Sequence, residues 1–441
     1  MTQSDRFIEC NKNFRITGEA LLKRNLDSQY AFLYQDRQKR LGERILKVAK
    51  GLYGDDSEFA DFTNIEEDKE VLIFGVIIRK MGERDSVLKQ LNDEDIDLEE
   101  VVDTYYDVLD PSPQDRIFVE NSKQRLVLED VDMYNIISGS VLGFKGILKG
   151  GTDIFKASSV IYPEPLPVER LMPTGPEKFI CFTSGLSFRD NSEQSGLDFL
   201  DMMMMQFRGQ NGPLPDGTKR FFDNTETFVF AGGMFESQCL RKKKFTDYVS
   251  VLTNHITNDE VRVVDDYLNG FAQLGKTVVM ASKGDLCTFT MPQQPAFNAL
   301  YSKAHESGNL LLTSNPTTFK IGNITYSGTS GENIWSIRKT MPGKNSLNIM
   351  KKTLEAQHYC PTCPDIVDGI PGLCHDYMIM ESYPQVYFCG NQKKFGWGNY
   401  YPPGSANPIL ILSIPSFRER NSVVFVNTRT LEITEYIFKS L

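Results

Sequence analysis

The second half of the chain carries short apolar runs separated by segments with the three-to-four residue spacing of an amphipathic helix. The clearest helix is expected over about 245–274, where Val261, Val264, Leu268 and Phe271 fall on one face. Apolar runs that resemble strands stand at 178–183, 227–231, 277–280, near 310, and at 319–326, 386–389, 409–414, 423–426 and 431–433. Apolar strands that alternate with helices predict an α/β domain with a mixed sheet.

Residues 70–165 show a different pattern, in which β-branched residues gather in short runs and glycines mark the turns. The runs lie at 71–78, 125–130, 140–148 and 155–162, with a Gly150-Gly151 turn before the last of them. Several short strands joined by glycine turns predict a small β-barrel of the oligonucleotide/oligosaccharide-binding (OB) type.

The helical spacing at 16–50 predicts an N-terminal helix, with Leu21, Leu26 and Leu33 among its apolar positions. Five prolines within 163–176 indicate a stiff linker and a domain boundary. The predicted organisation is an N-terminal helical segment (1–50) that packs on the C-terminal domain, an OB-fold domain (51–165), and an α/β domain (177–441).

The composition is that of an ordinary globular protein, with 40% apolar and 24% charged residues. No apolar stretch approaches the roughly 18 residues of a membrane span, so no membrane association is expected. The eight irregularly spaced cysteines suggest reduced thiols inside the cell. The net charge of −10 argues against a protein whose main work is to grip nucleic acid. The acidic run 92–100 and the basic run 241–244 are expected to face solvent.

The most informative chemistry follows four of the apolar runs. A calcineurin-like metallophosphoesterase places Asp, His and Asn side chains there to hold two metal ions that activate water. The corresponding positions in this chain are Gly185, Ser187, Gly233, Lys283, Gly284, Asp285, Asn391 and Lys393. Only Asp285 remains a good cation ligand, and a lysine ammonium repels a divalent ion. The chain therefore resembles such a phosphoesterase domain after loss of its chemistry, and these positions are interpreted as a vestigial metal site with no catalytic residue and no cofactor.

Several further segments occur in an order and spacing typical of one family. They are Ser-Gln-Tyr-Ala-Phe-Leu-Tyr at 28–34, Arg-Leu-Val-Leu-Glu-Asp at 125–130, Met-Pro-Gln-Gln-Pro at 291–295, Leu-Thr-Ser-Asn-Pro at 312–316, Gly-Thr-Ser-Gly-Glu-Asn at 328–333, Pro-Thr-Cys-Pro-Asp at 361–365 and Pro-Gln-Val-Tyr-Phe-Cys-Gly-Asn at 384–391. Over nearly its whole length the chain resembles the small regulatory B-subunit family of replicative DNA polymerases. The compact N-terminus and the segment at 386–391 favour the delta group over the alpha and epsilon groups.

The resemblance implies an OB barrel packed on an inactive phosphoesterase domain, in a nuclear scaffold protein of DNA replication and repair. It also implies binding to the cysteine-rich C-terminal domain of the delta catalytic subunit and to a third accessory subunit, with DNA contacted only indirectly. It does not locate the partner-binding residues. Two alternatives of another class are an OB-type single-stranded nucleic-acid binder and a residual metallophosphoesterase.

One cysteine motif departs from the family pattern. Cys360, Cys363, Cys374 and His375 have a spacing that fits a zinc site. The other interpretation is a proline-rich loop with free thiols. We favour that interpretation and expect no metal, since the family does not use these cysteines.

Overall fold

The computed structural model describes residues 9–10, 14–81, 111–171, 175–188, 195–210, 212, 214, 216–235 and 256–439. The acidic run 92–100 and the basic run 241–244 lie outside these residues. No helix in the described part of the chain is both long and apolar enough to span a membrane.

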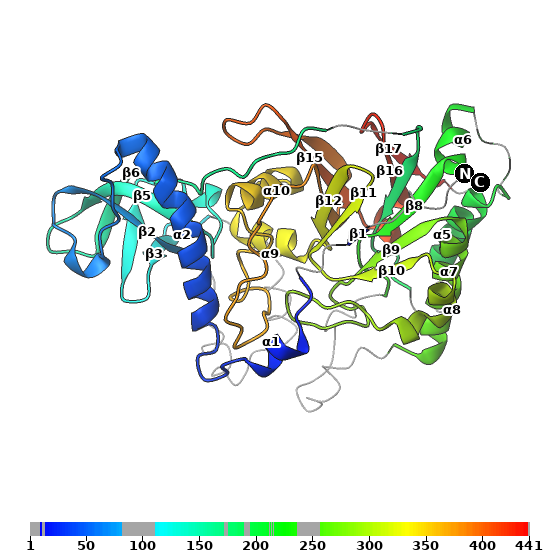
Figure 1. Ribbon diagram of the computed structural model, residues 1–441, viewed down its shortest axis with the longest axis horizontal. Helices are drawn as coiled ribbons and strands as arrows, with labels where there is room; N and C mark the ends of the chain where they lie inside the picture. The colour runs from blue at the N-terminus through cyan, green and yellow to red at the C-terminus, as the bar shows by residue number, and fades with distance from the viewer. Residues whose placement is uncertain are drawn as a thin grey trace.

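A closed barrel forms one end of the molecule (Figure 1). Its strands are β2 (Glu70–Lys80), β3 (Arg116–Glu120), β4 (Arg125–Glu129), β5 (Val141–Leu148) and β6 (Ile154–Ile161). They are joined in the order β2-β3-β4-β6-β5, with β5 closing on β2 and with β4 parallel to β6. This order confirms the predicted OB barrel, in which the sequence pattern had revealed every strand except β3.

The remaining strands build two sheets, each six-stranded within the described residues. The first sheet contains β1 (Glu9–Cys10), β11 (Thr317–Ile321), β12 (Ile324–Thr329), β13 (Val386–Gln392), β15 (Ile409–Pro415) and β14 (Gly396–Tyr400) in that order. The second contains β10 (Leu310–Thr313), β9 (Lys276–Met280), β8 (Thr225–Phe230), β7 (Phe179–Thr183), β16 (Ser422–Asn427) and β17 (Ile433–Ile437). The predicted strand at 319–326 is thus a hairpin, β11–β12, that turns at Gly322.

The two sheets pack face to face, and helices cover their outer faces. Along β7, Ile180 and Phe182 point into the core between the sheets, while Phe179 and Cys181 face the helices. Strands buried on both faces read as continuous apolar runs, which explains why the sequence pattern identified them. The helices are α5 (Ser195–Phe207), α6 (Asp216–Asp223), α7 (Asn258–Leu274) and α8 (Ser302–Glu306) outside the second sheet, α9 (Glu332–Thr340) and α10 (Ser346–Glu355) outside the first, and the short α11 (Phe417–Arg420).

The helix predicted over about 245–274 is described from Asn258 onward. Thr257 and Glu260 form a reciprocal capping box that starts α7 there. Residues 236–255, which hold the first part of the prediction, lie outside the described residues. The predicted face is correct, because Val264, Leu268 and Phe271 are buried in the core.

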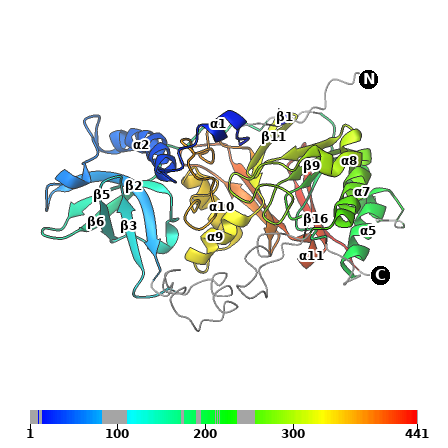
Figure 2. The same cartoon turned by 90° about the horizontal axis from the view of Figure 1, so that it is seen from below.

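The predicted N-terminal helix is two helices, α1 (Gly18–Leu22) and α2 (Ala31–Tyr53). Between them the side chain of Asn25 accepts the backbone N–H groups of Asp27 and Ser28, a local turn that competes with helix formation. The packing of this segment involves both domains. The apolar face of α2, carrying Leu41 and Ile45, is buried against the barrel, while its polar side contacts the C-terminal domain. Figure 2 shows α2 beside the barrel, with α9 and α10 between the barrel and the sheets.

Candidate functional site

The loops that follow β7, β8, β9 and β13 interlock at one edge of the two sheets. The backbone N–H groups of Gly185 and Ser187 donate to the carbonyls of Gly232 and Gly233, at 2.9 and 3.0 Å. The backbone N–H of Asn391 donates to the Ser184 hydroxyl at 2.8 Å and so links the first sheet to the second. The structure therefore brings Gly185, Ser187, Gly233, Asp285 and Asn391 together, and Lys283, Gly284 and Lys393 lie on the same loops.

The centre of this loop cluster is filled by protein atoms. Gly185 and Gly233 have left-handed backbones, with φ of +63° and +76°. A Cβ atom at either position would lie 2.7 or 2.6 Å from the side-chain oxygen of Asn391. The Asn391 amide is itself fixed, since it donates to the carbonyl of Ser330 at 2.8 Å. A carboxylate side chain at 185 or 233 would collide with its neighbours.

Asp285 uses its carboxylate to hold the loop after β8. One oxygen accepts the backbone N–H of Gly233 and the other accepts that of Phe235, both at 3.1 Å. Burial raises the pKa of Asp285 to about 6, and the backbone donors oppose that rise. The group is therefore ionised at neutral pH, and its charge is stabilised by backbone N–H groups.

The two lysines lie against aromatic rings. Lys283 Nζ is 4.8 Å from the ring centroid of Phe289 and 3.7 Å from the carboxylate of Glu332. Lys393 Nζ is 5.1 Å from the ring centroid of Trp335, whose indole N–H donates to the Asn391 carbonyl at 3.0 Å. One carboxylate, one amide and two ammonium groups do not fit a dinuclear metal centre, which needs several imidazoles and carboxylates.

The cysteine motif lies elsewhere, at the junction of the two domains. Cys360 and Cys363 are buried, and burial raises the pKa of the Cys360 thiol to about 12 and that of Cys363 well above its usual value. Cys374 is exposed, and His375 Nδ1 lies 3.1 Å from the carboxylate of Asp36. Across the described part of the chain, no three His, Cys, Asp or Glu side chains are grouped to hold a metal ion.

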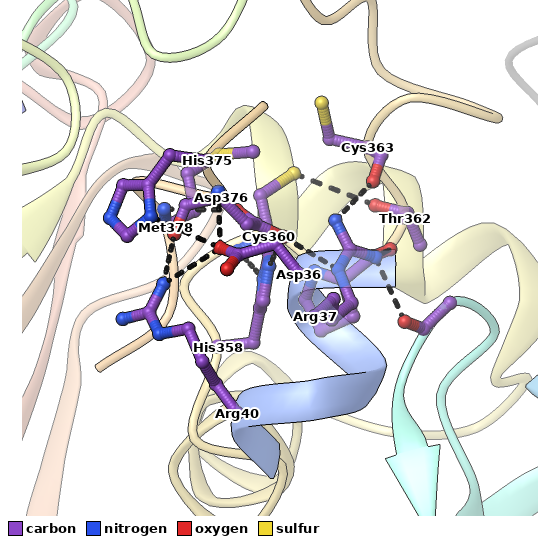
Figure 3. A network of polar contacts seen from close by, with 12 residues as sticks. Asp36, Arg37, Arg40, His358, Cys360, Thr362, Cys363, His375, Asp376 and Met378 are labelled. Carbon is purple, nitrogen blue, oxygen red and sulfur yellow. Dashed lines mark hydrogen bonds and ion pairs between the residues drawn. The ribbon is translucent and has the colours of Figure 1, made fainter. Parts of the chain in front are cut away.

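A buried ion pair at the same junction joins three parts of the chain (Figure 3). Arg37 of α2 is fully buried, and its Nε donates to the Asp376 carboxylate at 2.6 Å. The rest of its guanidinium donates to the carbonyls of Gly139 in the barrel domain at 2.9 Å, Pro361 at 3.0 Å and Cys363 at 2.8 Å. The side chain thus ties α2 and the barrel to the loop that precedes β13.

The Arg37 cluster, which we define as Arg37, Asp376 and His358, has a fixed protonation pattern. His358 Nδ1 accepts the backbone N–H of Cys360 at 3.1 Å, so its Nε2 carries the proton donated to Asp376 at 2.9 Å. Burial lowers the pKa of His358 to about 4, which keeps the ring neutral. Burial alone would raise the pKa of Asp376, but Arg37 and His358 hold it well below its usual range.

Sequence reasoning missed this cluster, although one signal was available. In α2 the buried positions Leu33, Leu41, Ile45 and Ala49 recur at four- and eight-residue steps, and Arg37 occupies the missing step of that series. A charged residue at a core position of a helix needs a buried partner. That partner, Asp376, is 339 residues away and could not be identified from spacing.

Two family models match the chain. Residues 29–160 match the OB-fold domain of the DNA polymerase delta subunit, and residues 180–397 match the B-subunit family of DNA polymerases alpha and epsilon. The first region ends one residue before β6 does, and the second covers most of the two-sheet domain. The barrel and the two-sheet domain each match a model of DNA polymerase B-subunits, so the chain falls in that class.

Similar proteins extend over almost the full chain. A probable DNA polymerase delta small subunit of Caenorhabditis elegans is 27% identical, covering 98% of this chain and 95% of that protein. The delta small subunits of Arabidopsis thaliana and Saccharomyces cerevisiae are 25% and 24% identical, covering 83% and 93% of this chain and 82% and 89% of theirs. The chain belongs to the family of DNA polymerase delta small subunits.

Proposed function

We propose that the chain is the non-catalytic accessory subunit of a DNA polymerase delta that works in the nucleus in DNA replication and repair. Its work is to bridge the cysteine-rich C-terminal domain of the catalytic subunit and a third accessory subunit. Family membership supports the accessory role. The two named partners and the nuclear location are parts of the proposal that go beyond that membership.

We further propose that the two-sheet domain is an inactive calcineurin-like phosphoesterase. The observation that carries this proposal is the packed centre, where the Asn391 side chain fills the space between Gly185 and Gly233. The strands leading to the centre are retained, while the donors that would hold metal ions are replaced. A domain kept in this form contributes through its surface.

The bridging role is tested by co-expressing the chain with the C-terminal domain of the catalytic subunit. The pair is expected to elute as one complex in gel filtration, since a domain of this size can offer the roughly 1,600 Å² that a stable interface buries. Separate elution of two folded proteins at micromolar concentration would contradict the bridge.

The residual-phosphoesterase alternative is tested independently with a chromogenic phosphodiester and manganese. No turnover is expected from wild-type protein. Activity that persists through purification and disappears in Asp285→Ala would support an enzyme instead.

A further inference from the structure

Five side chains from α9 and from the loops after β9 and β13 lie beside the packed centre, in two groups that Glu332 of α9 relates. They are Lys283, Phe289, Trp335, Arg338 and Lys393, hereafter the aromatic–cation strip. The strip follows one face of α9, because Glu332, Trp335 and Arg338 are three residues apart on that helix. Lys283 reaches the carboxylate of Glu332 from the loop after β9, and Lys393 reaches Trp335 from the loop after β13.

Each cation of the strip is held against a ring. Lys283 lies 4.8 Å from the centroid of Phe289, and Arg338 and Lys393 lie 4.6 and 5.1 Å from that of Trp335. Phe289 is 55% exposed and the Lys283 side chain 40% exposed. Cation–π contacts of this kind position a charge without neutralising it.

One carboxylate, that of Glu332, lies beside the three cations of the strip, which leaves an excess of positive charge. Glu332 stands near Lys283 and also accepts from the side-chain amide of Gln293. Among the described residues, Arg338 hydrogen-bonds to the neutral side chains of Ser346 and Gln392. Among the described residues, the contacts of Arg338 and Lys393 are therefore with aromatic or uncharged groups. This local positive charge lies on a chain whose net charge is −10.

We propose that the aromatic–cation strip is a docking surface for a short acidic segment of a partner protein, with Glu or Asp side chains beside apolar ones. The carboxylates pair with Lys283, Arg338 and Lys393, and the apolar side chains cover the exposed edges of Phe289 and Trp335. This extends the proposed accessory role by giving the chemistry of one partner segment, without specifying which subunit carries it.

A single-stranded nucleic acid is the less favourable occupant. Base stacking needs open ring faces, and here cations already lie over the rings. Nucleic-acid affinity also depends on neutralising many phosphates along a track, whereas this strip offers three cations beside the Glu332 carboxylate. An acidic peptide needs only two or three charge contacts.

The test uses the full chain and a fluorescein-labelled peptide of repeating Glu-Phe-Asp units in an anisotropy titration at about 50 mM and about 300 mM salt. The variant Lys283→Glu with Lys393→Glu reverses two exposed charges. The control, Lys149→Glu with Lys219→Glu, makes the same change of net charge in a barrel turn and in α6, where both lysines are exposed. We expect the strip variant to weaken binding about tenfold or more, and the control to stay within about twofold.

The proposal is overturned if the wild-type chain does not bind the peptide at low salt, or if both variants lose affinity equally. Tighter binding of single-stranded oligothymidylate than of the peptide, lost in the strip variant, would assign the surface to nucleic acid and also reject the proposal. None of these outcomes depends on co-elution with the catalytic subunit, so the bridging role can fail or hold separately.

Discussion

Replacing Arg37 by methionine should strongly destabilise the junction between α2, the barrel and the C-terminal domain. The Arg37→Met substitution keeps an unbranched stem and removes the guanidinium. Asp376 would keep the Nε2–H of His358 and the backbone N–H of Met378, at 2.9 and 3.0 Å, but would lose the cation 2.6 Å away. The result is a buried carboxylate without a compensating charge.

The expected loss of stability follows from that geometry. Removing one partner of a buried ion pair costs about 3–5 kcal/mol, since the remaining charge stays in a site of low polarity. The carbonyls of Gly139, Pro361 and Cys363 also lose a donor, which places the loss at the upper end of the range. A total stability of about 5–15 kcal/mol is typical of a folded protein, so this loss is a large fraction.

Urea unfolding at pH 7 measures the loss, followed by the fluorescence of the chain's two tryptophans, Trp335 and Trp397. The pH matters because Arg37 and His358 hold the pKa of Asp376 below its ordinary 3.8. The stabilisation is therefore complete above about pH 4 and disappears as the pH falls further.

Two further variants make the test specific. Lys47→Met removes another cation of α2 that is 70% exposed and pairs with Glu164, and it should cost less than about 1 kcal/mol. Adding Asp376→Asn to Arg37→Met should recover about 2 kcal/mol, because the unpaired charge is gone. If Arg37→Met costs no more than Lys47→Met, or if the added substitution recovers nothing, the Arg37 cluster does not hold the buried charge in the way described.

Other predictions concern the same cluster, the packed centre and the cysteines. His358 binds its proton with a pKa of about 4 when folded against 6.5 when unfolded, so stability should fall by roughly 3 kcal/mol as the pH drops from about 6.5 to about 4. Urea titrations across that window should show a flatter profile for His358→Gln, and an equal slope in both proteins would refute the assignment. Gly233→Ala should cost about 2–4 kcal/mol of stability, because the new methyl group strains the backbone and contacts Asn391. Gly322→Ala, with φ of +59° and open space around it, should cost only about 1 kcal/mol of strain. Thermal unfolding compares the two variants, and equal losses would mean that the centre is not tightly packed. Dialysis against a chelator followed by elemental analysis should leave far less than one equivalent of zinc, and a full equivalent lost in Cys360→Ser with Cys363→Ser would establish a zinc site.

The sequence predicted best the strands in which consecutive residues are all buried. The strands at 178–183 and 386–389 are buried on both faces, so their apolar letters are continuous and easily recognised. Strand β3 alternates and is short, and the helix at 16–50 is interrupted by the side chain of Asn25, an effect that periodicity does not detect. The Arg37 cluster depends on contacts between residues 339 positions apart, which a single sequence does not reveal.

The packed centre also indicates what holds the two sheets in register under the proposed function. In a dinuclear enzyme, metal ions bound by loops from several strands supply that link. Here the backbone N–H of Asn391, from the first sheet, reaches the hydroxyl of Ser184 in the second, and the Ser184 carbonyl accepts the backbone N–H of Phe417 at 2.7 Å. Hydrogen bonds thus tie the loops together, and close contacts around Gly185 leave no space for a metal-binding side chain. Building a metal site here would require coordinated changes in several loops at once. Under the proposed function, a domain linked in this way has the rigid shape that a binding surface needs.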